Sequence, residues 1–124
     1  MAEMYFTKEH EWIKVTGATG KVGISEHAAH ELGDITFVEL PKVGKTVKQF
    51  DVLAAIESVK AASDIFAPLS GKVLAVNEDL DTTPETVNES AEEKAWMVEL
   101  EISDSAELKN LMTQDQYNEF LKTL

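Results

Sequence analysis

Lys60 is the first residue to consider for covalent chemistry in this chain. It lies midway between two apolar segments, Val52–Ile56 and Ile65–Pro68, in a sequence with 11 basic and 23 acidic residues. A lysine amine that has lost its proton is a nucleophile, and lysine is a common site of covalent modification. Lys60 is therefore the first candidate for a functional residue, and the two apolar segments are the elements that must position it.

The other residues that often carry chemistry form no recognisable catalytic or metal motif. His27 and His30 lie three residues apart in a predicted helix, but the chain has no cysteine and no third ligand in register. An exposed helical face is therefore expected, not a metal site. A small acidic enzyme using Glu11, Asp64 and histidine residues is an alternative interpretation. Activity of the unmodified protein on a substrate would be needed to support it.

The composition excludes several function classes. The formal net charge of −12 repels a phosphate backbone, so nucleic acid is a poor candidate partner. The absence of cysteine excludes disulfides, thiolate catalysis and cysteine metal sites. With 124 residues, 44% of them hydrophobic, we expect one compact domain over residues 1–124. No apolar run approaches the roughly 20 residues that span a bilayer, and residues 1–11 resemble no export or transit signal, so a cytoplasmic protein is expected.

Short strands punctuated by turn residues dominate the expected secondary structure. Apolar segments recur about every ten residues, which is typical of a sandwich or barrel, so we predict an all-β core with peripheral helices. The expected strands lie at about residues 12–24, 35–76 and 96–102. A short helix is expected at about 26–32, capped by Ser25 and ended by Gly33, and two C-terminal helices are expected at about 104–111 and 114–122.

Two capping boxes support the C-terminal helices. Asp104 pairs with Glu107 in the first, and Thr113 pairs with Gln116 in the second. Apolar residues follow each box at helical spacing, so both helices are expected to pack against the sheets.

The segment around Lys60 has two interpretations from its residues alone. Asp51 suits a helix N-cap, the alanines favour a helix, and no Asn-Gly or Asp-Gly turn lies between Glu57 and Asp64. The two flanking apolar runs have the length of strands, which favours a hairpin with Lys60 near its tip. Helix and hairpin therefore both remain open on local grounds.

Several motifs together resemble the glycine cleavage system H proteins. Residues 56–71 contain Glu-Ser-Val-Lys-Ala followed by Ser-Asp and Ala-Pro-Leu-Ser-Gly, and residues 5–12 end in His-Glu-Trp. Further similar segments cover nearly the whole chain: 22–25, 31–35, 37–41, 76–78, 84–88 and 102–104. Biotin carriers differ because they have methionines on both sides of the modified lysine, and lipoyl domains of oxoacid dehydrogenases usually have Asp-Lys-Ala.

The resemblance implies a non-catalytic carrier with a barrel-sandwich hybrid fold. Two small antiparallel sheets would present Lys60 at an exposed turn, and the amine would carry lipoic acid as N6-lipoyl-lysine. The family role is glycine catabolism. The lipoyl arm takes an aminomethyl group from a pyridoxal-phosphate glycine decarboxylase to a tetrahydrofolate-dependent aminomethyltransferase, and a dihydrolipoyl dehydrogenase reoxidises it. A lipoate ligase or a lipoyl or octanoyl transferase would load the arm, and the carrier is expected to be a monomer.

The resemblance also assigns weaker roles to other residues. Glu11, in the His-Glu-Trp motif, is implied to line a cleft where the loaded arm rests. Ser63 and Asp64 are candidates for contact with the arm or with the ligase, and Glu57 is a further candidate for ligase recognition. Each of these acids has a simpler interpretation as a solvated surface residue.

One segment departs from the family pattern. Where the family commonly has Pro-Tyr-Gly-x-Gly-Trp, this chain has Ser-Ala-Glu-Glu-Lys-Ala-Trp at residues 90–96, and the composition of residues 89–95 favours a helix. The departure keeps an alternative role open, in which the same Lys60 donates its lipoyl group to oxoacid dehydrogenase subunits.

Overall fold

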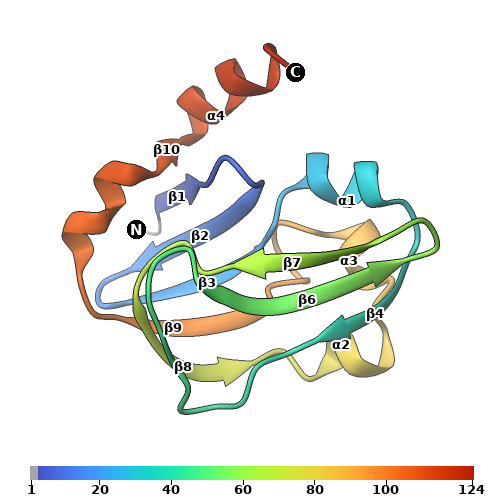
Figure 1. Ribbon diagram of the computed structural model, residues 1–124, viewed down its shortest axis with the longest axis horizontal. Coiled ribbons are helices and arrows are strands. Elements are labelled where there is room, and N and C mark those ends of the chain that lie inside the picture. The colour runs from blue at the N-terminus through green and yellow to red at the C-terminus, as the bar shows by residue number, and fades with distance from the viewer. Residues whose placement is uncertain (1–2) are drawn as a thin grey trace.

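The computed structural model describes residues 3–124 and contains two antiparallel sheets with helices around them (Figure 1). Residues 1 and 2, which belong to the N-terminal segment expected to carry no export signal, lie outside the described residues. The larger sheet has the strand order β10-β1-β2-β3-β9-β8-β5, and the smaller has the order β4-β6-β7. The strands are β1 (Glu3–Phe6), β2 (Glu11–Thr16), β3 (Thr19–Ile24), β4 (Ile35–Glu39), β5 (Thr46–Val47), β6 (Val52–Ser58), β7 (Ala62–Phe66), β8 (Gly71–Val76), β9 (Val98–Ile102) and β10 (Met112–Thr113).

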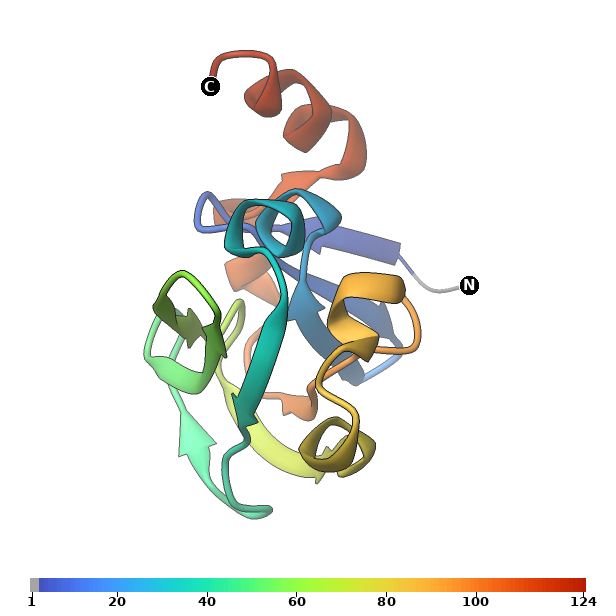
Figure 2. The same ribbon diagram turned by 90° about the vertical axis from the view of Figure 1, so that its right-hand side faces the viewer.

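The helices are short and lie outside the sheets (Figures 1 and 2). They are α1 (Glu26–Leu32), α2 (Asp79–Thr82), α3 (Thr86–Glu89), the 3₁₀ helix η1 (Ser105–Asn110) and α4 (Gln114–Leu121). Figure 2 shows α4 at one end of the molecule, beyond α1. Within residues 3–124 no helix has the length and apolar character that crossing a membrane requires.

The main core lies between the two sheets. Ile13 and Val22 from the larger sheet and Ile56 and Ile65 from the smaller sheet belong to one buried cluster. In β8 and β9 the first buried residues alternate with more exposed ones, as expected for half-buried strands. A second cluster forms where α4 packs on β1 and β2, and its members are Phe6, Trp12 and Tyr117.

The first helix has the caps expected from its sequence. The Ser25 hydroxyl accepts a hydrogen bond from the Ala28 amide at 3.1 Å. Gly33 ends the helix with a positive φ of 79°, which a residue without a side chain adopts at little cost. These signals are local, so the sequence was sufficient to predict them.

The C-terminal capping boxes have different outcomes. The box of Thr113 and Gln116 is confirmed, and it begins α4. The box of Asp104 and Glu107 is wrong: Asp104 caps the 3₁₀ helix η1, but the Glu107 carboxylate accepts from the Ser70 amide at 2.8 Å and from the Ser70 hydroxyl at 2.7 Å. Ser70, which is distant in the sequence, therefore binds the Glu107 carboxylate in place of the Asp104 amide that a capping box would use.

The helix expected at residues 89–95 is also wrong. Helix α3 ends at Glu89, and turns follow from Ala91 to Ala95. Ser90 organises these turns, because its carbonyl accepts from the Ala95 amide at 3.0 Å and its hydroxyl accepts from the Lys94 amide at 3.1 Å. The Glu92 carboxylate instead accepts from the Glu26 amide at the start of α1, at 2.8 Å.

Candidate functional site

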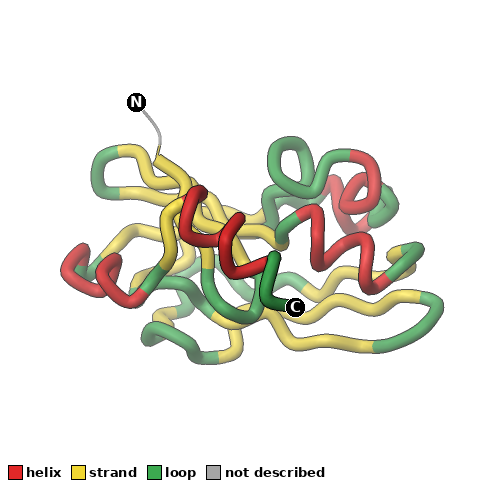
Figure 3. Tube along the Cα trace, turned by 90° about the horizontal axis from the view of Figure 1, so that it is seen from above, coloured by secondary structure: helices red, strands yellow, loops and turns green. Residues whose placement is uncertain are grey.

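Lys60 lies in the turn that joins β6 to β7, so the hairpin interpretation of this segment is confirmed. The last paired residues below the turn are Glu57 and Ala62. Figures 1 and 3 show this hairpin end projecting from the body of the molecule. Lys60 and both its neighbours are exposed, and Val59 has 68% of its surface accessible. Among residues 3–124 no ion pair involves the Lys60 amine.

Hydrogen bonds from Ser58 fix the backbone of this turn. The Ser58 hydroxyl accepts from the amides of Lys60 and Ala61, both at 3.1 Å, and the Ser58 amide donates to the Ala61 carbonyl at 2.8 Å. These bonds leave the Lys60 side chain free while they hold its Cα. This role of Ser58 depends on the geometry of the turn and could not be predicted from the residue type.

The turn also rests on the segment that follows α1. The Val59 amide donates to the Asp34 carbonyl at 3.0 Å. A Cβ placed on Gly33 would lie 3.0 Å from Cε of Lys60, so the lysine stem passes close over the Gly33 backbone. The root of the side chain is therefore supported on one side by a residue without a side chain.

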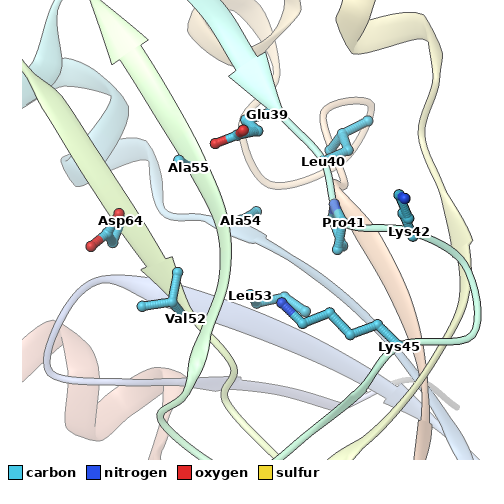
Figure 4. Close-up of a pocket in the computed structure, with 10 residues that line it drawn as sticks. All are labelled: Glu39, Leu40, Pro41, Lys42, Lys45, Val52, Leu53, Ala54, Ala55 and Asp64. Carbon is cyan, nitrogen blue, oxygen red and sulfur yellow. The ribbon is translucent and has the colours of Figure 1, made fainter.

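Ser63 and Asp64 lie on the same hairpin as Lys60 and are exposed. Asp64 contributes to two adjoining grooves on the outer face of the smaller sheet. The first is about 590 Å³, and Figure 4 shows its lining residues: Glu39, Leu40, Pro41, Lys42, Lys45, Val52, Leu53, Ala54, Ala55 and Asp64. The second is about 410 Å³ and is bordered by Ser63 and by the carboxylates of Glu39, Glu57 and Asp64.

Glu11 is placed differently from the other candidates, because it is 1% exposed. Its carboxylate accepts a hydrogen bond from the Thr7 hydroxyl and another from the Phe66 amide at 3.1 Å. Burial raises the pKa of Glu11 above its ordinary value, although these hydrogen bonds favour the ionised form and oppose the shift. Glu11 therefore joins β2 to the end of β7 and is not a surface acid.

A groove of about 610 Å³ lies beside Glu11. Thr7, Lys8, Glu9, Phe50, Phe66 and Asn110 line it, and Glu11 is not among its lining residues. Strand β7 runs from Ala62 beside the turn to Phe66, whose amide Glu11 binds, so Glu11 lies at the end of β7 away from Lys60. Glu57, Ser63 and Asp64 lie on the hairpin that carries Lys60.

His10 and His27 belong to an aromatic cluster between α1 and α4, whereas His30 is exposed. His10 Nδ1 lies 2.7 Å from the Tyr117 hydroxyl, and the rings of His10 and His27 lie 4.7 Å apart. Burial is the main cause that lowers the pKa of His10, and His27 adds to it. Within residues 3–124 no three histidine or carboxylate side chains are grouped to hold a metal ion.

The exposed amine fits covalent attachment of a prosthetic group. The residues beside it are small or point outward, and Ala61 and Ala62 are exposed. A modifying enzyme needs access to the amine, and the carrier needs a fixed root for the arm; the turn geometry provides both.

Comparison with known proteins finds relatives that match nearly the whole chain. A family model described as glycine cleavage H-protein matches residues 4–124. The glycine cleavage system H protein of Staphylococcus saprophyticus is 52% identical over 120 residues, which cover 97% of this chain and 95% of that protein. The corresponding protein of Bacillus licheniformis is 50% identical over 97% of this chain and 94% of its own.

A solved structure agrees with the fold. The crystal structure of a glycine cleavage system H protein from Mycobacterium marinum matches with a TM-score of 0.84 at 30% identity and covers 97% of both chains. This match confirms the predicted fold class, a lipoyl-domain-like barrel-sandwich with peripheral helices, in which the sheets are not closed.

Proposed function

Because this chain belongs to the glycine cleavage H-protein family, we propose that it is the lipoyl carrier of a glycine cleavage system and that Lys60 bears the lipoyl group. The family carries lipoate and acts as a carrier subunit, not as a catalyst. The observation that supports Lys60 is the hairpin: its amine is exposed, while Ser58 holds the backbone on both sides of the tip.

In this proposal the protein positions the lipoyl group, and the lipoyl group supplies the chemical reactivity. When attached, the lipoyl group supplies a disulfide that can be reduced and reoxidised. The β6–β7 hairpin fixes the root of the arm, and the exposed tip lets the same arm enter several active sites in turn. Tethering gives an effective concentration on the order of mM once the carrier docks, so the interface with each enzyme need not be tight.

The acidic residues around the hairpin are assigned to recognition. Ser63 and Asp64 lie on the strand that leaves Lys60, and Glu57 and Glu39 border the same grooves. We assign these residues to contacts with the arm or with the loading enzyme. Glu9 lines the groove of Phe50 and Phe66, and Glu11 is retained as the buried acid beside this groove, where it acts through Thr7 and the Phe66 amide.

The proposal includes specific partners. They are the pyridoxal-phosphate glycine decarboxylase, the tetrahydrofolate-dependent aminomethyltransferase, dihydrolipoyl dehydrogenase and a lipoate ligase or lipoyl transferase. A monomeric carrier in the bacterial cytoplasm is part of the same proposal, supported by the bacterial origin of the relatives. The relatives are named for glycine cleavage, which favours this role over donation of lipoyl groups to oxoacid dehydrogenases.

Reconstituted glycine oxidation tests the proposal. The lipoylated protein is mixed with the decarboxylase, the aminomethyltransferase and dihydrolipoyl dehydrogenase, and NADH formation from glycine is measured. Lys60→Arg should abolish turnover, while Lys72→Arg, the same change at an exposed lysine of β8 in the larger sheet, should retain it. Equal turnover by Lys60→Arg and wild type would overturn the proposal.

A further inference from the structure

Asn88 contacts the polypeptide segment on which the Lys60 turn rests. Its side-chain amide donates to the Gly33 carbonyl at 2.7 Å and accepts from the Ile35 amide at 2.9 Å. The side chain thus bonds to both sides of Asp34, as a neighbouring strand would. Both ends of the Asn88 amide are used, which fixes its orientation.

The same peptide group connects Asn88 to the turn. The amide of Ile35 and the carbonyl of Asp34 belong to one peptide unit, and the Asp34 carbonyl accepts from the Val59 amide at 3.0 Å. Asn88 and Val59 therefore bind opposite ends of this unit. Hydrogen bonds joined through one peptide polarise each other, so loss of the first weakens the second.

Gly33 adds a second contact with the lysine. The stem of Lys60 lies over Gly33, whose carbonyl Asn88 holds. A shift of the Gly33–Ile35 segment would move both the support of Val59 and the surface under Lys60. Helix α3, which carries Asn88, is itself held by the buried side chain of Val87.

We infer that Asn88 is a positioning residue for the lysine, and that it orders the Lys60 turn through the Asp34–Ile35 peptide for the enzyme that attaches the lipoyl group. The inference rests on the proposed function, because it requires Lys60 to be the acceptor. If the Lys60 turn is disordered in the free carrier, an enzyme that binds the ordered turn must use part of its binding free energy to order it. The apparent affinity of the enzyme for the carrier is then reduced in proportion to the fraction of carrier molecules whose turn is ordered, while the chemical step is unchanged.

The test compares Asn88→Ala with Glu89→Ala. Glu89 is the next residue of α3 and is also exposed, so the control carries a similar truncation on the same helix. Purified apo-protein is titrated into a lipoate ligase reaction with lipoate and ATP, and modification is followed by intact mass. Asn88→Ala should raise KM for the carrier roughly threefold to tenfold, as expected for loss of one hydrogen bond, and leave kcat unchanged.

Two further measurements separate positioning from general loss of stability. Amide hydrogen exchange at Val59 should become faster in Asn88→Ala, while the buried amide of Ile56 should keep its protection. Asn88→Asp retains an acceptor for the Ile35 amide but places a carboxylate oxygen against the Gly33 carbonyl, so its KM should also rise relative to wild type.

An unchanged KM for Asn88→Ala relative to Glu89→Ala would overturn the inference, and so would unchanged exchange at Val59. A wild-type protein that the ligase does not modify at Lys60 would instead overturn the proposed function. The two failures are therefore distinguishable in the same experiment.

Discussion

At the scale of single residues, Glu11 combines burial with two hydrogen bonds that require an acceptor at each carboxylate oxygen. The Thr7 hydroxyl already accepts from the amides of Glu9 and Glu11, at 3.2 and 3.1 Å, so its one hydrogen is available for Glu11. The second oxygen receives the Phe66 amide. Burial nevertheless raises the pKa of Glu11, so the folded protein binds its proton more tightly than the unfolded chain does.

This pKa shift determines how the contribution of Glu11 to stability changes with pH. The stabilising contribution of protonated Glu11 is complete below the ordinary value of 4.5 and is lost as pH rises through the higher pKa of the folded state. The free energy of unfolding of the wild type should therefore fall relative to that of Glu11→Gln as pH rises above 4.5. Urea denaturation across pH 4 to 7 measures this difference.

Glu57→Gln is the matched control for this prediction, because Glu57 is exposed on β6. The control should keep the wild-type pH dependence. A difference between wild type and Glu11→Gln that stays constant with pH, or that increases in favour of the wild type, would contradict the assignment.

The sequence was sufficient to predict that Lys60 is exposed, but it was not sufficient to predict that Glu11 is buried. Lys60 could be placed because two apolar runs flank it and the surrounding motif resembles a known family. The sequence did not show that Glu11 is buried, because its partner amide at Phe66 is 55 residues away. Asn88 was noticed only as part of a family motif, and its contacts with Gly33 and Ile35 depend on the fold.

At the scale of elements, local signals predicted what local interactions determine. The caps of α1 and α4 use partners within a few residues, so their sequences were sufficient. The helix expected at 89–95 and the Glu107 cap failed because Glu92 and Glu107 bind groups in other elements, at Glu26 and Ser70. Tertiary hydrogen bonds of this kind are invisible to helix propensity.

Gly33→Ala tests the junction between α1 and the Lys60 turn. Gly33 has φ 79° and ψ −153°, a region that essentially only glycine adopts, so an alanine there should cost about 1–3 kcal/mol of unfolding free energy. The new Cβ would also press on Cε of Lys60 at 3.0 Å and move the lysine stem. Urea denaturation and the rate of enzymatic lipoylation give the two readouts.

Gly17→Ala is the control because Gly17 also has a positive φ, of 61°, but nothing lies within 4 Å of its added Cβ. Both variants should lose stability, and only Gly33→Ala should be lipoylated more slowly at a temperature where both are folded. Equal lipoylation rates for the two variants would show that the contact with Lys60 has no effect.

At the scale of the whole molecule, the charge governs encounters with partners. A carrier of net charge −12 is attracted over long distances by cationic surfaces. The screening length falls from about 30 Å at 0.01 M salt to about 10 Å at 0.1 M. The KM of glycine decarboxylase for the lipoylated carrier should therefore rise severalfold over this range, with kcat nearly unchanged, in steady-state assays.

A charge-matched pair of variants locates this effect. Neutralising Glu57 and Asp64, beside Lys60, should weaken the salt dependence of KM. Neutralising Glu99 and Glu101, on β9 of the other sheet, changes the net charge equally and should have a smaller effect. Equal effects of the two pairs would mean that total charge, not the face near Lys60, controls docking.

Mass spectrometry of the loaded protein shows whether Lys60 is the one attachment point of the lipoyl group. Apo-protein is incubated with lipoate ligase, lipoate and ATP, and intact mass is followed by peptide mapping. We expect one lipoyl group per chain, on Lys60, and none on the other ten lysines. A lipoyl group on another lysine, or an unmodified Lys60 in folded protein, would contradict this expectation.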